Sequence, residues 1–321
     1  MIQRNILIRS LTVVASSAFI LGISEILLRV LAPVYTVGIL RSYQYDAVIG
    51  MRVKPGIYML ETTDHQEEIR TNSLGTVNFQ EDFKAYERLI FCLGDSFTEG
   101  TGLPADASYP FQLDLLLNRD ADGVYHKRYG VVNLGLAGLG GEQSLLLLRE
   151  YAGRLGKPFA VLYLGSDNDA DDDRRFLSGA RQGHLVDGNP HYGLFLRPLQ
   201  WAGTTEIGKR MKLVLQRGQP PSPATSSVSV AEQEGPVLKR IAEQSRAYDA
   251  RVVVSWIGTE SYLWLQDWAQ EHSVAFADWR PRAQSVALQI PALPQTNPHS
   301  GGHLRGWVMR TVAEAFAEQL R

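Results

Sequence analysis

A serine that follows a buried apolar run is the residue of this chain best placed to do chemistry. The apolar run 89–93 ends at Gly94-Asp95-Ser96. Asp95 or Ser96 could simply cap a helix at a strand-to-helix turn. Alternatively, Ser96 is a nucleophile held at the mouth of a sheet, because a hydroxyl attacks carbonyl carbon once a neighbouring base takes its proton. The second possibility requires a base and a set of hydrogen-bond donors.

The C-terminal part of the chain supplies two candidate bases. His299 and His303 lie in "NPHSGGHLRGW", shortly before a final helical pattern. Histidine can accept a proton near neutral pH, and a usable base is decided by its distance from the nucleophile. Both histidines are candidates on these grounds, and the family resemblance given below favours His303 with His299 as the alternative.

Two further segments carry residues to which the family resemblance given below assigns an oxyanion hole. Gly138 lies in "NLGLAG", and Asn168 lies between two aspartates in "LGSDND". Donors fixed in advance stabilise the charge that develops on a carbonyl oxygen. A glycine lets the backbone approach closely. An amide can donate to the oxyanion whereas a carboxylate repels it, so we prefer Asn168 to Asp167.

The elements around these residues predict an α/β domain. Four apolar runs, "RLIFCLG", "GVVNLG", "FAVLYLG" and "RVVVSWIG", each end in glycine, and a fifth, "SVAFADW", is shorter. Amphipathic helical patterns separate them. Strands that alternate with helices indicate a mainly parallel sheet, whose strand ends meet at one edge and collect functional residues. This domain is expected to cover residues 88–321, with a flexible surface loop at 217–232.

Taken together and in this order, the four motifs resemble the SGNH (GDSL) hydrolase superfamily. The resemblance implies a flavodoxin-like three-layer α/β/α fold with a mainly parallel sheet. It implies Ser96 as the nucleophile and His303 as the base. The oxyanion hole would consist of the Ser96 N–H, the Gly138 N–H and the Asn168 side chain. No metal or organic cofactor is implied.

The sequence departs from the family pattern in the third motif. That motif usually reads Gly-x-Asn-Asp, whereas here Gly165-Ser166 is followed by Asp167. Aligned without a gap, Asp167 takes the asparagine position. A bulge of one residue restores Asn168 to that position, and both remain candidates for the third donor.

A second departure concerns the group that orients the base. The family places an aspartate two or three residues before its histidine, but those positions here are Gly301 and Ser300. Ser300, Asn297 or a backbone carbonyl would then orient the base, with Asn297 in the aspartate position if His299 is the base. A neutral orienter stabilises imidazolium less than a carboxylate does, so a slow, dyad-like enzyme is expected.

The N-terminus predicts a membrane anchor over residues 1–33. Fifteen uncharged residues, 10–24, lie between two arginines and the pair Glu25 and Arg29. With its apolar flanks this helix is long enough to span a bilayer. A signal peptide cleaved after Val30-Leu31-Ala32 is the alternative. Arginines at the short end place that end in the cytoplasm.

The remaining sequence features limit the possible binding partners and the cellular location of the protein. The segments "ISEILLR" and "RTNSLG" resemble a membrane-tethered bacterial subgroup of the same family, with residues 34–87 as a membrane-proximal segment. That resemblance implies an inner-membrane protein whose catalytic domain faces the periplasm or cell exterior. Net charge is −2 with no basic run, which gives no sign of a nucleic-acid surface. The acidic cluster 167–173 is expected to be a solvated loop rather than a calcium site.

These observations predict a serine ester hydrolase that acts on an acyl ester, such as an acetyl ester of an envelope polysaccharide, or on a lipid ester. Two other functions remain open. A polysaccharide O-acetyltransferase would use the same residues with a sugar hydroxyl in place of water. A non-catalytic envelope binding protein would keep the fold alone, and the missing aspartate is its main support.

Overall fold

The computed structural model describes residues 2–32, 42–61, 66–179, 186–217, 227–258, 262–296 and 302–321. Its centre is a five-stranded sheet in which every neighbouring pair is parallel. The strand order is β6 (Tyr129–Asn133), β5 (Arg88–Gly94), β7 (Ala160–Ser166), β8 (Arg251–Ile257) and β9 (Ala275–Phe276). The predicted mainly parallel α/β sheet is therefore confirmed.

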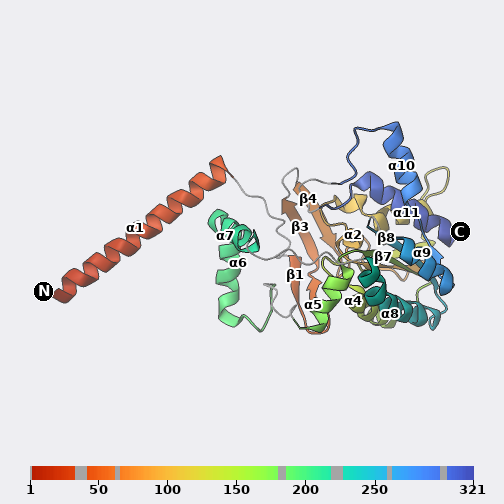
Figure 1. The fold of residues 1–321 in the computed structure, drawn as a ribbon, viewed down its shortest axis with the longest axis horizontal. Coiled ribbons are helices and arrows are strands. Elements are labelled where there is room, and N and C mark those ends of the chain that lie inside the picture. The colour runs from red at the N-terminus through yellow and green to blue at the C-terminus, as the bar shows by residue number, and fades with distance from the viewer. Residues whose placement is uncertain are drawn as a thin grey trace.

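Alternation along the strands gives the sheet two apolar faces. In β5, Phe91 and Leu93 point to one face, and Ile90 and Cys92 to the other, all four fully buried. The first face is covered by α4 (Gly141–Leu155), α8 (Ser227–Arg246) and α9 (Tyr262–Glu271). The second is covered by α3 (Tyr109–Asn118), α10 (Arg280–Gln289) and α11 (Gly306–Leu320). The result is the predicted three-layer arrangement (Figure 1).

Two antiparallel hairpins precede the sheet. They are formed by β1 (Tyr43–Asp46) with β2 (Gly50–Val53), and by β3 (Gly56–Glu61) with β4 (Gln66–Thr71). Tyr43 and Ile49 of the first hairpin belong to the same buried cluster as Phe91. The Arg52 guanidinium donates to Glu150 of α4 at 2.7 Å. The first hairpin is thereby packed against the α/β domain.

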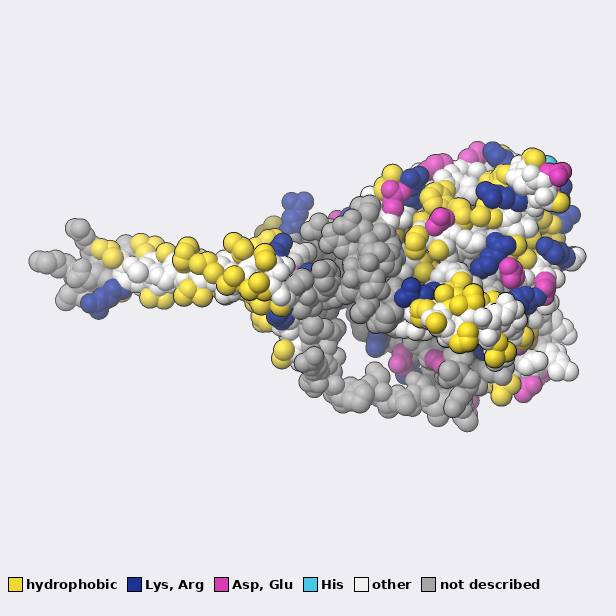
Figure 2. Space-filling view, turned by 90° about the horizontal axis from the view of Figure 1, so that it is seen from above, with side chains coloured by type: hydrophobic (Ala, Val, Ile, Leu, Met, Phe, Trp, Pro, Cys, Tyr) yellow, Lys and Arg dark blue, Asp and Glu magenta, His cyan; other side chains and the backbone are white. Residues whose placement is uncertain are grey.

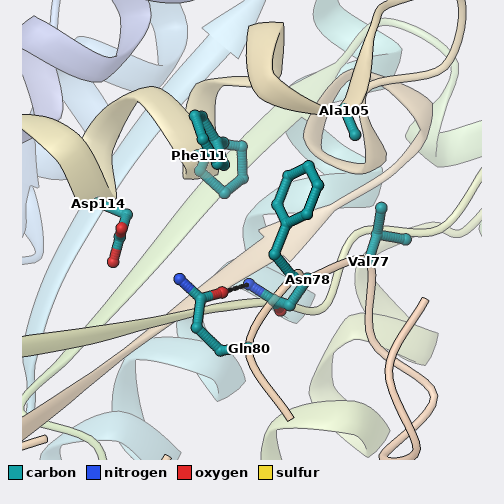
Figure 3. A pocket seen from close by; sticks show the side chains of 8 residues that line it. Val77, Asn78, Gln80, Ala105, Phe111 and Asp114 are labelled. Atoms are coloured by element: carbon teal, nitrogen blue, oxygen red, sulfur yellow. Dashed lines mark hydrogen bonds between the residues drawn. The ribbon is translucent and has the colours of Figure 1, made fainter. Parts of the chain in front are cut away.

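The segment after the second hairpin covers the open edge of the sheet. Asn78 donates its amide to the Val131 carbonyl at 2.9 Å and accepts from the Asn133 N–H at 2.8 Å, both on edge strand β6. A shallow pocket lies beside this contact, and Figure 3 shows Phe111 and Asp114 of α3 across it from Gln80. No residue that the sequence predicts for the active site lines this pocket.

The N-terminal helix α1 (Ile2–Leu31) projects from the domain. Its part Ile8–Leu31 has a mean hydropathy of 2.0 and no buried residue, so by length and composition it could span a membrane or serve as a signal sequence. Figure 2 shows apolar side chains along α1, with basic ones toward both of its ends. The helices α6 (Leu196–Thr204) and α7 (Glu206–Arg217) lie between α1 and the domain (Figure 1).

Two local predictions are corrected. The acidic cluster is not a solvated loop, because most of it forms α5 (Asp169–Leu177), with Asp169, Asp172 and Asp173 buried. An aspartate in the first turn of a helix is favoured by the unpaired N–H groups there. The segment 217–232 is not one loop, because Arg217 ends α7 and α8 begins at Ser227. Residues 218–226 lie outside the described residues.

Candidate active site

The candidate nucleophile lies where β5 gives way to α2 (Ser96–Glu99) at the carboxyl edge of the sheet. Asp95 caps this short helix, because its carboxylate accepts from the Phe97 N–H at 2.9 Å. Gly94 has φ +144°, and an added Cβ would lie 2.3 Å from the Thr98 hydroxyl oxygen. The turn therefore requires glycine before Asp95. The Asp95 side chain performs the capping, and the Ser96 hydroxyl stands beside it, half-buried.

The His303 imidazole lies against that hydroxyl. Its Nε2 is 2.7 Å from Ser96 Oγ, which is hydrogen-bonding distance. Its ring also packs on Phe97, with the ring centroids 5.0 Å apart. On the C-terminal side of the imidazole, Leu304 is buried in the core next to α11, while Gly302 before it has φ +87°.

The other predicted residues of that loop lie outside the described residues. These are the alternative base and the candidate orienting groups, namely His299, Ser300 and Asn297. The second base and the orienter therefore stay predictions.

The loop that carries Gly138 is braced from behind by a buried glutamate of α2. Gly138 has φ +69°, a conformation that favours glycine. The preceding residue, Ala137, donates its N–H to Glu99 at 3.1 Å. Glu99 also accepts from Thr101 Oγ1 at 2.7 Å and from the hydroxyl of Tyr43 in β1. The first hairpin, α2 and the Gly138 loop are thus joined through one carboxylate, whose pKa is raised by burial.

Glu99 was not singled out from the sequence. A signal for it is nevertheless present, because a lone acid follows the serine motif directly in a segment that is otherwise small and apolar. An acid in such a position is either exposed or matched by several donors.

The third motif turns Asn168 toward the serine motif and Asp167 away from it. The Asn168 amide nitrogen lies 3.3 Å from the Asp95 carboxylate and 2.9 Å from that of Asp172. Asp167 instead accepts from the indole N–H of Trp256 at 2.8 Å. Asn168 immediately precedes α5 as its N-cap residue.

A buried acidic network lies beneath these groups. Ser166 Oγ is 2.7 Å from Asp95 Oδ2 and 3.0 Å from Asp169 Oδ1, while the Tyr163 hydroxyl donates to Asp169 at 2.6 Å. Burial raises the pKa of both carboxyl groups, and of Asp169 the more. The two carboxyl groups repel each other, so the charge of Asp95 raises the pKa of Asp169 further. A positive charge on His303 lowers the pKa of Asp95 in turn.

No protein-family model and no curated protein matches the chain. Solved structures do match. TesA is 17% identical with a TM-score of 0.43, over 73% of this chain and 98% of that chain. A catalytic mutant of Axe2, an acetylxylan esterase from Geobacillus stearothermophilus, is 13% identical with a TM-score of 0.41, over 74% and 96%. A member of the lipolytic protein G-D-S-L family from Veillonella parvula is 12% identical with a TM-score of 0.40, over 72% and 96%.

Proposed function

We propose that this protein is a serine ester hydrolase of the SGNH (GDSL) type. The observation that carries the proposal is the 2.7 Å contact between Ser96 Oγ and His303 Nε2 at the carboxyl edge of the sheet. His303 takes the hydroxyl proton as Ser96 attacks the ester carbonyl carbon. The tetrahedral intermediate expels the alcohol, which receives that proton from His303. Water then cleaves the acyl-serine, again with His303 as the base.

The oxyanion would be held by the N–H groups of Ser96 and Gly138 and by the Asn168 amide. Neither of the two backbone N–H groups donates to another described residue. The positive φ of Gly138 and the brace from Glu99 fix the orientation of that loop before substrate binds. Donors fixed in this way cost no reorganisation during the reaction. The longer of the two Asn168 contacts, to Asp95, is the one that an oxyanion would replace.

The Asp95 carboxylate would stabilise the imidazolium. A positive charge on the His303 imidazole lowers the pKa of Asp95, so the two groups attract each other when both are charged. Asp95 is buried at 0% exposure, so water screens this attraction little. An electrostatic contribution of this kind is a substitute for the aspartate that the motif lacks.

The substrate would be an acyl ester, with an acetyl ester of an envelope polysaccharide or a lipid ester as the expected class. The support is the location that α1 suggests. In this helix Ile8–Leu31 has a mean hydropathy of 2.0 and no buried residue. We place the protein in a bacterial inner membrane, with α1 as a single-pass anchor and the domain on the periplasmic or exterior side.

The test is hydrolysis of p-nitrophenyl acetate by the full-length protein in detergent. Ser96→Ala and His303→Ala should each lower kcat by about a thousandfold or more, because each removes one half of the nucleophile and base pair. Ser285→Ala, on the exposed surface of α10, is the matched control and should leave kcat unchanged. Equal rates in all four proteins would contradict the proposal.

An oligosaccharide acceptor added to the same assay separates hydrolysis from transfer. Release of acetate at an unchanged rate supports the hydrolase. Acetylated oligosaccharide as the main product would instead identify an O-acetyltransferase that uses the same residues.

A further inference from the structure

The segment 193–217 exposes more apolar surface than a water-facing helical hairpin can be expected to carry. It consists of the short helix η4 (Gly193–Phe195), α6 and α7. Leu194 is 95% exposed, Phe195 73% and Trp201 70%. Between residues 193 and 203 the only charged residue is Arg197. Removing apolar surface from water is favourable by about 25 cal/mol per Å², so binding of a partner that covers this surface is favoured.

The described structure leaves this surface turned outward. Helix α6 is seated on the domain through Leu196, which is buried, and through Gln200, whose amide donates to Asp187 at 3.1 Å. In α7, Met211 is 61% and Val214 66% exposed. The segment is thus attached to the domain by few contacts, while most of its large apolar side chains remain exposed.

The first turn of α7 is fastened to α1. The Glu25 carboxylate of α1 accepts from the Glu206 N–H at 2.9 Å and from the Ile207 N–H at 3.2 Å. Arg210 of α7 donates to the Ala32 carbonyl at the end of α1. Figure 1 shows α6 and α7 beside that end of α1. The exposed apolar surface therefore adjoins the one helix of the described chain that could span a bilayer.

The position of Glu25 sets the depth at which this contact occurs. Ile8–Leu31 is 24 residues long, or about 36 Å at 1.5 Å per residue, against a hydrocarbon core of about 30 Å. Glu25 precedes Leu31 by 31 − 25 = 6 residues, or about 9 Å. A carboxylate is costly in hydrocarbon. Glu25, paired with Arg29 at 2.7 Å, therefore belongs near the boundary with the headgroups.

We propose that residues 193–217 lie in the membrane interface as a second, peripheral attachment beside α1. Leu194, Phe195 and Trp201 enter the boundary between headgroups and acyl chains, where tryptophan is favoured. Arg197 reaches anionic headgroups from the same segment. The occupant of this surface is the lipid bilayer. The proposal rests on α1 spanning that bilayer and does not depend on catalysis.

The experiment uses the full chain in vesicles of phosphatidylcholine and phosphatidylglycerol. Single cysteines are introduced as Leu194→Cys and Trp201→Cys and labelled with a polarity-sensitive fluorophore. The native Cys92 is buried and does not take the label. Leu288→Cys is the control, because Leu288 is 81% exposed and belongs to α10, which lies on the side of the domain away from α1 (Figure 1). Lipids with a nitroxide near the start of the acyl chain serve as quenchers.

Labels at 194 and 201 should emit at shorter wavelength and be quenched about twofold or more, while the label at 288 stays unquenched. Nitroxides on the acyl chains reach only labels that enter the hydrocarbon boundary. Anchoring of the protein through α1 alone would therefore not quench the labels at 194 and 201. No quenching at 194 and 201 overturns the proposal. Disulfide-linked dimers of Leu194→Cys without quenching would identify a second copy of the chain as the occupant and would also overturn it.

Discussion

At the residue scale, the site depends on which of two neighbouring side chains serves the oxyanion. Asn168 lies beside Asp95 in the serine motif, whereas Asp167 is bound to the Trp256 indole. From the sequence both residues remained candidates for the third donor, because an alignment without a gap selects Asp167. Only the geometry shows which of the two side chains turns toward the serine motif. The contact between Ser96 and His303, 207 residues apart, was predicted from their positions at a strand end and before the last helix. The role of Glu99 was not predicted, because two of its three donors, Tyr43 and Ala137, come from distant parts of the chain.

Asn168→Asp should lower kcat for p-nitrophenyl acetate by about 100- to 1000-fold, because a donor is lost and a repelling charge is added. Asp167→Asn is the matched change in the opposite direction. Its amide oxygen can still accept from the Trp256 indole, so kcat should stay within about twofold. Steady-state kinetics of both variants check the assignment. A large loss in Asp167→Asn with none in Asn168→Asp would reverse it.

At the element scale, the strand-to-helix turns are the parts that the sequence predicted best. Apolar runs that end in glycine predicted the parallel sheet, because an apolar run and the glycine that ends it are local sequence signals. The two N-terminal hairpins were not predicted, since polar, turn-rich strands such as Gln66–Thr71 carry little apolar alternation. The acidic cluster was misread for a related reason. Helix α5 packs against α4 and α8, and Asp173 accepts from the Glu142 N–H of α4 at 3.0 Å, contacts that the acidic run itself does not indicate.

Gly94→Ala should destabilise the protein by about 2 kcal/mol or more and abolish hydrolysis. The added methyl group would meet the Thr98 hydroxyl and the Leu164 carbonyl oxygen, the latter at 2.4 Å, at a positive φ. Denaturant unfolding and kcat measure the two effects.

The control for this substitution is Gly153→Ala, at an exposed position of α4, where an added methyl group meets nothing within 4 Å. It should stabilise the protein by about 0.5–1 kcal/mol and leave kcat unchanged. Equal effects of the two substitutions would show that the turn at Gly94 is not restricted as described.

At the scale of the whole molecule, buried carboxyl groups couple stability to pH. Glu234 of α8 is fully buried, and within the described chain neither of its carboxylate oxygens has a hydrogen-bond partner. Burial, with the charges of Asp173, Glu142 and Asp172 nearby, raises its pKa from 4.5 to about 8. The unfolded chain therefore releases this proton first. The contribution of Glu234 to the free energy of unfolding is fully present below pH 4.5. It is lost as the pH rises from 4.5 toward 8.

Glu234→Gln should remove that part of the pH dependence. The loss of stability between pH 5 and 8 should shrink by at most about 4 kcal/mol, because an amide cannot ionise. Denaturant unfolding in detergent at several pH values measures the slope. Glu243→Gln, an exposed glutamate of the same helix, is the control and should leave the slope as in the wild type. An unchanged slope in Glu234→Gln would contradict the assignment.

The most direct measurement of the central claim is covalent labelling of the full-length protein with a fluorophosphonate. Only a serine activated by a neighbouring base reacts with this probe. The account predicts one adduct per chain, located on Ser96 by mass spectrometry, absent in Ser96→Ala and strongly slowed in His303→Ala. Absence of any adduct on the wild type, under conditions in which a known serine esterase reacts, would contradict the account and favour a non-catalytic binding protein.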